Sequence, residues 1–409
     1  MEYGLIGAKL GHSYSPEIYK EMVGFNYTLN EIKEEDIKAF LDKRDFKGIN
    51  VTIPYKQTVL PYVDYIDDAV KAIGACNTIV NRDGKLCVYN TDAPGFEALV
   101  LRSGIQIKDK KVAILGAGGA SKPAQYILKK LGAKEILVTD MRDVPGCIKN
   151  EELPEDIDVL VNTTPCGMYP KNDTIAIDID RFPNLEGVID IVYNPLKTPL
   201  VLEAEKRGIK AEAGLYMLVA QAYHAAQIYL GKELDYSLIE KTYQHLRNDK
   251  KNIVLIGMPT SGKTSVGKEL AKSFNKQFVD IDEEIVKKIG MEISEFFKLN
   301  GEKAFRDIEE EVVSEVAKHP SQIIATGGGS ILREKNVDHL RQNGTLYFLD
   351  RPLEKLITTS SRPLSSDREA LKKRYEERYG IYSSVADIKI DASGTIEDSV
   401  KAILEKEGK

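Results

Sequence analysis

The sequence predicts an α/β protein that contains two nucleotide-binding cores. Two stretches carry this prediction, residues 110–140 and residues 251–282. Each stretch gives a short apolar run, a glycine-rich turn, a segment of helical period and a second apolar run, which is the pattern of a βαβ unit. The glycine patterns differ in kind, and 409 residues are too many for one ordinary core. We therefore interpret the stretches as parts of separate domains.

The composition is typical of a globular protein that acts on small molecules. Hydrophobic residues make up 42% and charged residues 29%, with a net charge of −6 and no basic block for nucleic acid or a membrane surface. No signal peptide or membrane span is expected, because no apolar stretch approaches roughly 18 residues. The four cysteines lack CxxC spacing, which favours reduced thiols in a cytoplasmic protein. The five histidines are scattered, so a histidine metal site is not expected.

The first domain is predicted to have two parts, and the sequence of one part is interrupted by that of the other. Its opening part holds short strands between helices, and "NRDG" at 81–84 is typical of a hairpin turn. Strands and helices alternate after that, and a long helical run closes the domain. The predicted boundaries are residues 1–246 for the first domain (1–100 and 214–246 for substrate, 101–213 for the dinucleotide), 247–251 for the linker and 252–409 for the second domain.

The clearest motif of the first domain is "GAGGAS" at 116–121, which follows an apolar strand and opens a helix. Gly116 allows the tight turn, Gly118 lets the backbone approach a pyrophosphate, and the helix N-terminus supplies N–H donors. Asp140 ends the next strand, where dinucleotide folds place an acidic residue. A plain strand–turn–helix junction is the alternative, because Ser121 replaces the third glycine. The predicted cofactor loop is Gly116, Ala117, Gly118, Gly119, Ala120 and Ser121.

Two residues upstream of this loop are candidates for proton transfer. Lys56 follows a strand and a proline turn in "NVTIPYK", and Asp92 ends the strand of "YNTD". A lysine and an aspartate that meet in a cleft could share a proton, since the surroundings tune the pKa of the lysine. Spacing alone favours a simpler interpretation, in which Lys56 is a solvated surface lysine and Asp92 caps the next helix.

Residues 1–246 resemble shikimate dehydrogenase along nearly their whole length. The motifs that carry the resemblance are "GHSYSP" (11–16), "GINVTIPYK" (48–56), "GACNTIV" (74–80), "NTD" (90–92), "GAGGAS", "NTTPCGM" (162–168), "DIVYNPLKTPL" (190–200) and "GLYMLVAQA" (214–222). The resemblance implies an α/β substrate domain with a Rossmann-like dinucleotide domain. It also implies reversible reduction of 3-dehydroshikimate to shikimate by a nicotinamide hydride.

The same resemblance implies roles for individual residues. Lys56 and Asp92 match the catalytic pair of the family, and Ser13 and Ser15 match the serines that hold the substrate carboxylate. The further substrate-side matches are Thr52, Asn77, Asp92 and Gln221 for the ring hydroxyls, and Tyr193.

The cofactor of the first domain is expected to be NADP or NAD. The NADP-dependent enzymes of the family commonly have Asn where this chain has Asp140. A carboxylate there favours the ribose 2′-hydroxyl of NAD and repels a 2′-phosphate, although Arg142 could pair with a phosphate. The following stretch is also shorter than in the family. We therefore expect a preference that is relaxed or shifted toward NAD, against a family that uses NADP.

The second domain opens with "GMPTSGKT" (257–264), which fits the full P-loop pattern between an apolar strand and a helix. Its backbone N–H groups can cradle phosphates, Lys263 can reach the β and γ oxygens, and Thr264 can ligate Mg²⁺. The predicted ATP-binding residues in this loop are Gly257, Pro259, Thr260, Ser261, Gly262, Lys263, Thr264 and Ser265.

Further along this domain, three features predict an acceptor site. Asp280 and Asp282 end a strand and are expected to share one face, since side chains alternate along a strand. Arg306 lies on a probable helix with Glu309 near it, and a run of three glycines at 327–329 would let a ligand approach the backbone. The alternatives are a solvated strand end and a surface ion pair.

Residues 250–409 resemble shikimate kinase, on the P-loop, the D-x-D pair, "GEKAFRDIE" (301–309), "GGG", "SRPL" (361–364) and "ERYGIYSSVAD" (377–387). The resemblance implies a P-loop kinase domain with a parallel sheet. In it, Asp282 would orient or deprotonate the shikimate 3-hydroxyl, while Asp280 and Thr264 would hold Mg²⁺. Arg306 and Arg378 would clamp the carboxylate. The remaining implied contacts are Gly327, Gly328 and Gly329 with the ring, and Arg362 with the phosphates.

Two departures from the kinase family affect the nucleotide side. Gly380 stands where the family commonly has proline, and the shortened segment before Arg362 leaves no clear counterpart for the arginine that lies against adenine.

Together the two halves predict a bifunctional enzyme that makes shikimate and then phosphorylates it with ATP. The alternatives are a quinate-accepting dehydrogenase joined to the kinase, or one half that binds ligand without catalysis. The expected partners are small molecules, and the oligomeric state is left open.

Overall fold

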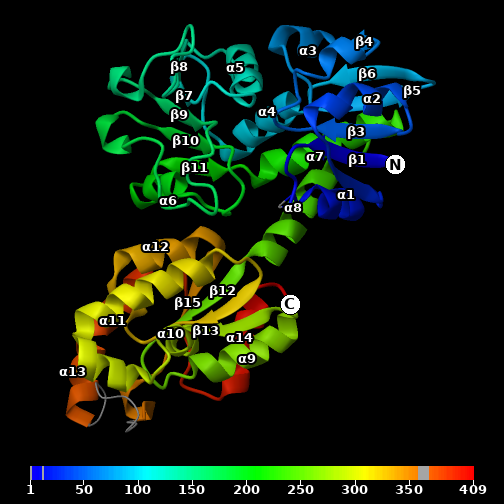
Figure 1. The fold of residues 1–409 in the computed structure, drawn as a ribbon. Coiled ribbons are helices and arrows are strands. Elements are labelled where there is room, and N and C mark those ends of the chain that lie inside the picture. Colours follow the sequence, from blue (N-terminus) through cyan, green and yellow to red (C-terminus); the bar gives the residue numbers. More distant parts are fainter. Residues whose placement is uncertain (1, 12, 358–367) are drawn as a thin grey trace. The chain divides into compact units, whose positions relative to one another are not determined.

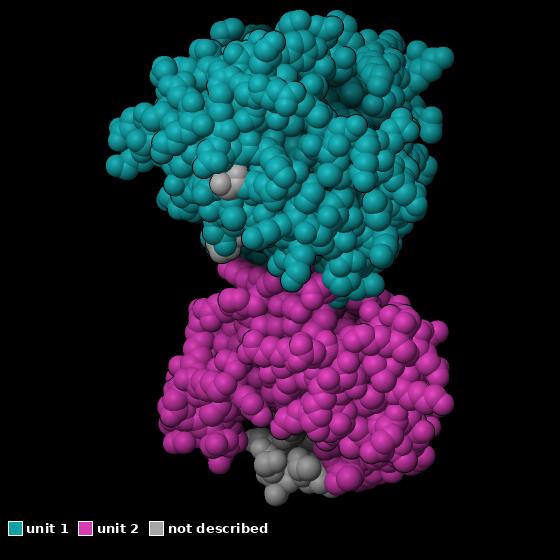
Figure 2. All heavy atoms as spheres, turned by 90° about the vertical axis from the view of Figure 1, so that its right-hand side faces the viewer, with its two compact units in different colours: residues 1–248 teal, residues 249–409 magenta. Residues whose placement is uncertain are grey.

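The computed structural model describes residues 2–11, 13–357 and 368–409. The chain forms two compact units, residues 1–248 and residues 249–409, which Figure 2 shows in teal and magenta. The boundary between them falls inside the last helix of the first unit, α8 (Ser237–Lys250). The stretch 247–251, predicted as the linker, is therefore helical as far as Lys250.

The first unit opens with a six-stranded sheet of order β2-β1-β3-β5-β6-β4. Strands β1, β2 and β3 run parallel, whereas β5 pairs antiparallel with both β3 and β6. Asp83 and Gly84 both have positive φ between β5 and β6, which confirms the predicted hairpin turn. The strands are β1 (Tyr3–Gly7), β2 (Tyr27–Glu31), β3 (Gly48–Val51), β4 (Tyr65–Ile66), β5 (Thr78–Arg82) and β6 (Lys85–Tyr89).

The second sheet of this unit is parallel throughout, in the order β11-β10-β9-β7-β8. Its three central strands are buried along nearly their whole length, as expected for a parallel sheet that is covered on both faces, whereas the edge strands are partly exposed. The strands are β7 (Lys111–Leu115), β8 (Glu135–Thr139), β9 (Val159–Asn162), β10 (Gly187–Asp190) and β11 (Lys210–Ala213).

Helices α4 and α7 lie between the two sheets (Figure 1). One apolar core contains residues of both helices together with Leu5 from the first sheet and Ile114 from the second. Gly95 permits their close approach, since a Cβ there would lie 2.9 Å from the Cβ of Gln221. The helices of the first unit are α1 (Ser15–Val23), α2 (Ile37–Asp42), α3 (Asp68–Ile73), α4 (Asp92–Ser103), α5 (Ser121–Lys130), α6 (Pro199–Lys206), α7 (Leu215–Leu230) and α8.

The second unit has one parallel five-stranded sheet, of order β13-β14-β12-β15-β16. Its strands are β12 (Asn252–Ile256), β13 (Gln277–Asp280), β14 (Gln322–Ala325), β15 (Gly344–Asp350) and β16 (Ile388–Asp391). Its helices are α9 (Lys263–Phe274), α10 (Ile281–Ile289), α11 (Ile293–Ala317), α12 (Glu334–Asn343), α13 (Arg368–Val385) and α14 (Ile396–Lys406). Helix α11 is broken at Gly301, whose φ of 79° and ψ of 174° are not helical.

Both units confirm the predicted α/β class with parallel sheets. In the part of the chain that the structure describes, no helix is long and apolar enough to cross a membrane.

Arg102 stabilises the packing of α8, the last helix of the first unit. Its guanidinium lies 4.6 Å from the ring centroid of Tyr216 on α7 and 4.4 Å from that of Tyr243 on α8. It also pairs with Glu240 on α8 at 2.6 Å. Cation–π contacts and an ion pair thus converge on one side chain.

We expect Arg102→Met to lower the free energy of unfolding of the first unit by about 1–3 kcal/mol, because both ring contacts and the ion pair are lost. Chemical denaturation measures this change. Lys38→Met, which removes an exposed ion pair with Asp42, is the control and should change little. Equal effects of the two substitutions would contradict a special role for Arg102.

Candidate active sites

Lys56 and Asp92 form a buried ion pair in the first unit. The Nζ of Lys56 lies 2.6 Å from Oδ2 of Asp92, and the side chains are only 16% and 7% exposed. Thr91, not Asp92, occupies the N-cap position of α4. The simpler interpretation of a solvated lysine and a capping aspartate therefore does not fit. The end of β3 and the start of α4 place the two groups together.

Asn77 and Gln221 join this pair through hydrogen bonds. The Nδ2 of Asn77 donates to Oδ1 of Asp92 at 3.0 Å and to Oε1 of Gln221 on α7 at 3.4 Å. The Oδ1 of Asn77 accepts from the backbone N–H of Thr91 at 2.7 Å. Asp92 thus has a cation on one oxygen and an amide on the other, which holds the Lys56 ammonium in a fixed orientation. Sequence reasoning did not include Thr91, which no separate motif signalled.

The other substrate-side residues lie in two smaller groups. The Oγ of Ser13 donates to Oγ of Ser15 at 3.1 Å, at the start of α1. The ring centroid of Tyr14 lies 5.4 Å from that of Tyr193, and burial raises the pKa of Tyr193. Thr52 follows β3, and its methyl group lies 2.6 Å from where a Cβ on Gly7 would be. Tyr14, the residue between the two serines, thus packs against Tyr193, which lies about 180 residues further along the chain.

The predicted dinucleotide loop joins β7 to α5. Gly116 has φ +94°, and a Cβ there would lie 2.6 Å from the methyl group of Thr164. A Cβ added at Gly118 or Gly119 would meet nothing within 4 Å, so this part of the loop faces open space. A turn that only glycine can make, an exposed backbone and the N-terminus of α5 fit a pyrophosphate.

Asp140 lies beside this loop and is already bonded. Its Oδ2 accepts from the N–H of Ala117 at 3.0 Å, and its Oδ1 from the N–H and Nε of Arg142 at 2.9 Å each. These donors, with the Arg142 side chain first, lower the pKa of Asp140. The two residues that were predicted to compete for a ribose substituent thus neutralise each other. Met141 between them is 91% exposed.

In the second unit, the P-loop joins β12 to α9. Gly257 and Gly262 have φ of +147° and +99°, and Lys263 donates to the carbonyls of Gly257 and Met258 at 2.9 Å each. The Oγ1 of Thr264 donates to Oδ2 of Asp280 at 2.8 Å. Thr264 and Asp280 therefore present hard oxygen ligands side by side, which fits Mg²⁺.

The expectation that Asp280 and Asp282 share one strand face is wrong. Strand β13 ends at Asp280, and Asp282 lies in the first turn of α10. The carboxylate of Asp280 caps this helix by accepting from the N–H of Asp282 at 3.0 Å. An aspartate just before a helix satisfies N–H groups that would otherwise lack partners, so the helix starts earlier than the strand pattern suggested.

Arg306 is buried rather than part of a surface ion pair. Its side chain is 11% exposed and lies 2.6 Å from Glu309, which is 1% exposed. Ser330 donates to the other oxygen of Glu309 at 2.7 Å. A Cβ on Gly329 would lie 2.4 Å from the Arg306 guanidinium. Only a residue without a side chain leaves room for Arg306 here, and Ser330 is a contact that sequence reasoning missed.

The remaining predicted acceptor residues meet around the same glycines. A Cβ on Gly327 would lie 2.7 Å from Oδ1 of Asp282. Arg378 on α13 donates to the carbonyl of Gly328 at 2.9 Å. Burial, and then the nearby Arg306, lower the pKa of Arg378. Asp282 and two arginines therefore surround one glycine run. Arg362 lies outside the described residues.

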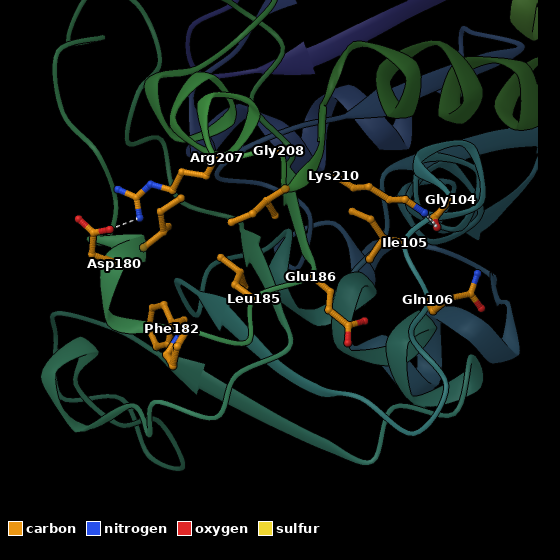
Figure 3. Close-up of a pocket in the computed structure, with 13 residues that line it drawn as sticks. Gly104, Ile105, Gln106, Asp180, Phe182, Leu185, Glu186, Arg207, Gly208 and Lys210 are labelled. Carbon is orange, nitrogen blue, oxygen red and sulfur yellow. Dashed lines mark hydrogen bonds and ion pairs between the residues drawn. The ribbon is translucent and has the colours of Figure 1, made fainter.

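A separate cavity of about 660 Å³ lies at the amino ends of β10 and β11, away from the dinucleotide loop. Its charged side chains already have partners, since Arg207 pairs with Asp180 and Lys210 donates to the carbonyl of Gly104 (Figure 3). Glu186 pairs with Lys110, which lies outside the cavity lining. These pairings give the cavity no common charge to select a ligand.

Family models match both units. Residues 5–79 match the shikimate dehydrogenase substrate binding domain, and residues 259–407 match shikimate kinase.

Curated relatives cover the first unit. A shikimate dehydrogenase (NADP(+)) from Clostridium perfringens is 39% identical over 267 residues, which cover 60% of this chain and 98% of the relative. One from Methanosphaera stadtmanae is 35% identical over 268 residues, covering 58% and 94%.

Solved structures of shikimate dehydrogenases match a similar share of the chain. The chorismate mutase/shikimate 5-dehydrogenase fusion protein from Clostridium acetobutylicum is 34% identical with a TM-score of 0.57, covering 60% of this chain and 96% of that chain. The Thermus thermophilus shikimate 5-dehydrogenase in complex with NADP(H) and shikimate is 28% identical with a TM-score of 0.55, covering 60% and 99%. This chain therefore belongs to the shikimate dehydrogenase family and carries a shikimate kinase domain joined to it.

Proposed function

We propose residue roles for both activities of this bifunctional shikimate-pathway enzyme, which is a dehydrogenase that uses NADP and a kinase that uses ATP. The first unit interconverts 3-dehydroshikimate and shikimate, and the second converts shikimate to shikimate 3-phosphate. The observation that supports the dehydrogenase roles best is the buried contact of Lys56 with Asp92. Both units retain the charged residues that catalysis needs, which argues against an inactive half. These residues are Lys56 and Asp92 in the first unit and Lys263, Asp280 and Asp282 in the second.

In the dehydrogenase, Lys56 acts as the acid and base. When bound, NADPH would supply the hydride for the reduction, and NADP⁺ would accept it in the oxidation. In the reduction, Lys56 gives a proton from Nζ to the carbonyl oxygen, which becomes the hydroxyl; in the oxidation it takes that proton back. Asp92 orients the Lys56 side chain, and Asn77 and Gln221 hold the ring hydroxyls. Ser13, Ser15 and Tyr193 hold the carboxylate end, and Thr52 contacts the ring.

In the kinase, Asp282 accepts the proton of the shikimate 3-hydroxyl or orients that hydroxyl for attack. ATP supplies the phosphoryl group, and Mg²⁺ would be held by Thr264 and Asp280. Arg306 and Arg378 bind the substrate carboxylate, because planar guanidinium groups match a planar acid. Glu309 fixes Arg306 in that orientation.

We place the enzyme in the cytoplasm. The four cysteines of the chain are free, as expected in a reducing compartment.

Lys56→Ala should lower NADP-linked turnover of shikimate by about 10²–10⁴-fold, which is the usual contribution of a positioned acid or base. ATP-dependent phosphorylation should not change. Lys263→Ala should give the reverse pattern. Both activities are assayed on the same purified chain, with quinate beside shikimate as substrate. Loss of both activities in either variant would contradict the separate sites, and faster turnover of quinate would favour the alternative substrate.

Asp140→Asn should raise the ratio of kcat/KM with NADP to kcat/KM with NAD by about ten-fold or more, because it removes a carboxylate that repels a 2′-phosphate and frees Arg142. We infer that the wild-type preference for NADP is correspondingly relaxed. Asp143→Asn, which neutralises a fully exposed carboxylate in the same turn, is the matched control. A ratio that is unchanged in Asp140→Asn would refute the inference.

Gly329→Ala should raise the KM for shikimate in the kinase by about 10–100-fold, since the new methyl group displaces Arg306 and charge-assisted hydrogen bonds are lost. The KM for ATP should change far less. Gly380→Ala is the control, because a Cβ there meets nothing within 4 Å. Equal changes in the two KM values would count against the role of Arg306.

A further inference from the structure

Asp190 is a buried carboxylate to which none of the roles above assigns a task. It ends β10 with none of its surface exposed. Its Oδ1 accepts from Nδ2 of Asn162 and from the N–H of Val192 at 3.0 Å each, and its Oδ2 accepts from Oγ1 of Thr198 at 2.7 Å. The three donors come from the end of β9, the loop after β10 and the start of α6. One side chain therefore joins three segments.

On one side, these bonds reach the dinucleotide loop. Asn162 lies between Leu115 and Asp190 in the register of the parallel sheet. Its Oδ1 accepts from the N–H of Thr164 at 3.0 Å and from the hydroxyl at 2.6 Å. The methyl group of Thr164 lies against Gly116, and the neighbouring Thr163 donates to the Gly116 carbonyl at 2.9 Å. Asp190 thus orients Asn162, which sets the loop that touches Gly116.

On the other side, the bonds reach the loop that carries Tyr193 and the start of α7. The N–H that Asp190 accepts belongs to Val192, the residue before Tyr193. The carbonyl of Val192 accepts from the N–H of Gly214 at 2.9 Å, at the start of α7, which carries Gln221. Thr198 accepts in turn from the N–H of Val201 at 3.3 Å and caps α6. Both ends of the loop around Tyr193 are therefore anchored on one carboxylate.

We propose that Asp190 is a positioning residue for hydride transfer, which keeps the dinucleotide loop and the Tyr193 loop in a fixed relation. The proposal rests on the dehydrogenase function given above. Reacting atoms must lie within about 3–3.5 Å of each other, and a misplacement of about 1 Å can cost 10²-fold in rate. Two loops that are hydrogen-bonded to the same buried carboxylate satisfy this requirement better than two independent loops.

Removing the charged Asp190 carboxylate from water has a cost in free energy. Burial raises its pKa to about 6, against the opposing hydrogen bonds of Thr198, Val192 and Asn162. Because the pKa is higher in the folded state, this group favours the fold at low pH, and that contribution is lost as the pH rises through about 6. Above that pH the buried carboxylate is charged at a desolvation cost, which its three hydrogen bonds offset in part.

The test compares Asp190→Asn with the wild-type chain in the oxidation of shikimate by NADP. Asn keeps the size of the side chain but loses the charge and one acceptor. We expect kcat to fall about ten-fold or more, with smaller changes in both KM values. The isotope effect on kcat with shikimate deuterated at carbon 3 should rise, because hydride transfer becomes the slow step.

Three further variants serve as controls. Thr198→Ser keeps the hydroxyl and should behave as wild type, whereas Thr198→Val should follow Asp190→Asn. Asp156→Asn changes an exposed carboxylate of the same domain and should leave kcat and the isotope effect unchanged. Kinase activity of the same chain calibrates the amount of folded protein in its second unit.

An unchanged kcat in Asp190→Asn would overturn the proposal. So would a lower kcat with an unchanged isotope effect and a lower melting temperature, since that result assigns Asp190 to folding only. A wild-type chain without NADP-linked turnover of shikimate would instead overturn the proposed function on which the inference depends.

Discussion

A carboxylate that folding removes from water must be paired with a cation or fully hydrogen-bonded, and both active sites depend on this constraint. An unpaired buried charge costs several kcal/mol, whereas a paired one is held in a fixed geometry. Asp92 is paired with Lys56, and Glu309 with Arg306. In each pair the cation is the group that would meet the substrate. The buried carboxylate therefore orients the reactive or binding group before the substrate arrives, which is the arrangement that rapid chemistry requires.

The parallel sheets decide where such pairs can form. Neighbouring parallel strands end at the same edge, so the loops that follow them lie side by side. In the second unit, Leu255 and Asp280 both register with Ala325, and this places the P-loop, the start of α10 and the glycine run next to one another. In the first unit the same arrangement brings Leu115, Asn162 and Asp190 into one row.

Glycine sets how closely these loops approach. At Gly116 the neighbour is Thr164, and at Gly329 it is the guanidinium of Arg306. A side chain at Gly329 would displace the end of the Arg306 side chain, whereas a side chain at Gly116, whose φ is +94°, would also strain the backbone turn. These glycines are thus part of the sites, and their spacing is what made the motifs visible in the sequence.

The sequence alone determined the fold class and the two nucleotide loops, because these depend on apolar periodicity and glycine spacing, which are local patterns. The two families followed from a resemblance carried by many motifs in the same order. It also named most of the residues that meet around Lys56 and Arg306, although not Thr91 or Ser330. Only the tertiary structure decided how their charges are paired. Asp92 bonds to Lys56 instead of capping α4, and Asp140 is held by Arg142. Asp280 caps a helix, and Asp190 gathers three segments. The pairings of Asp92 and Asp190 depend on which groups are buried together, and burial is set by residues far apart in the chain, whereas those of Asp140 and Asp280 depend on local backbone geometry.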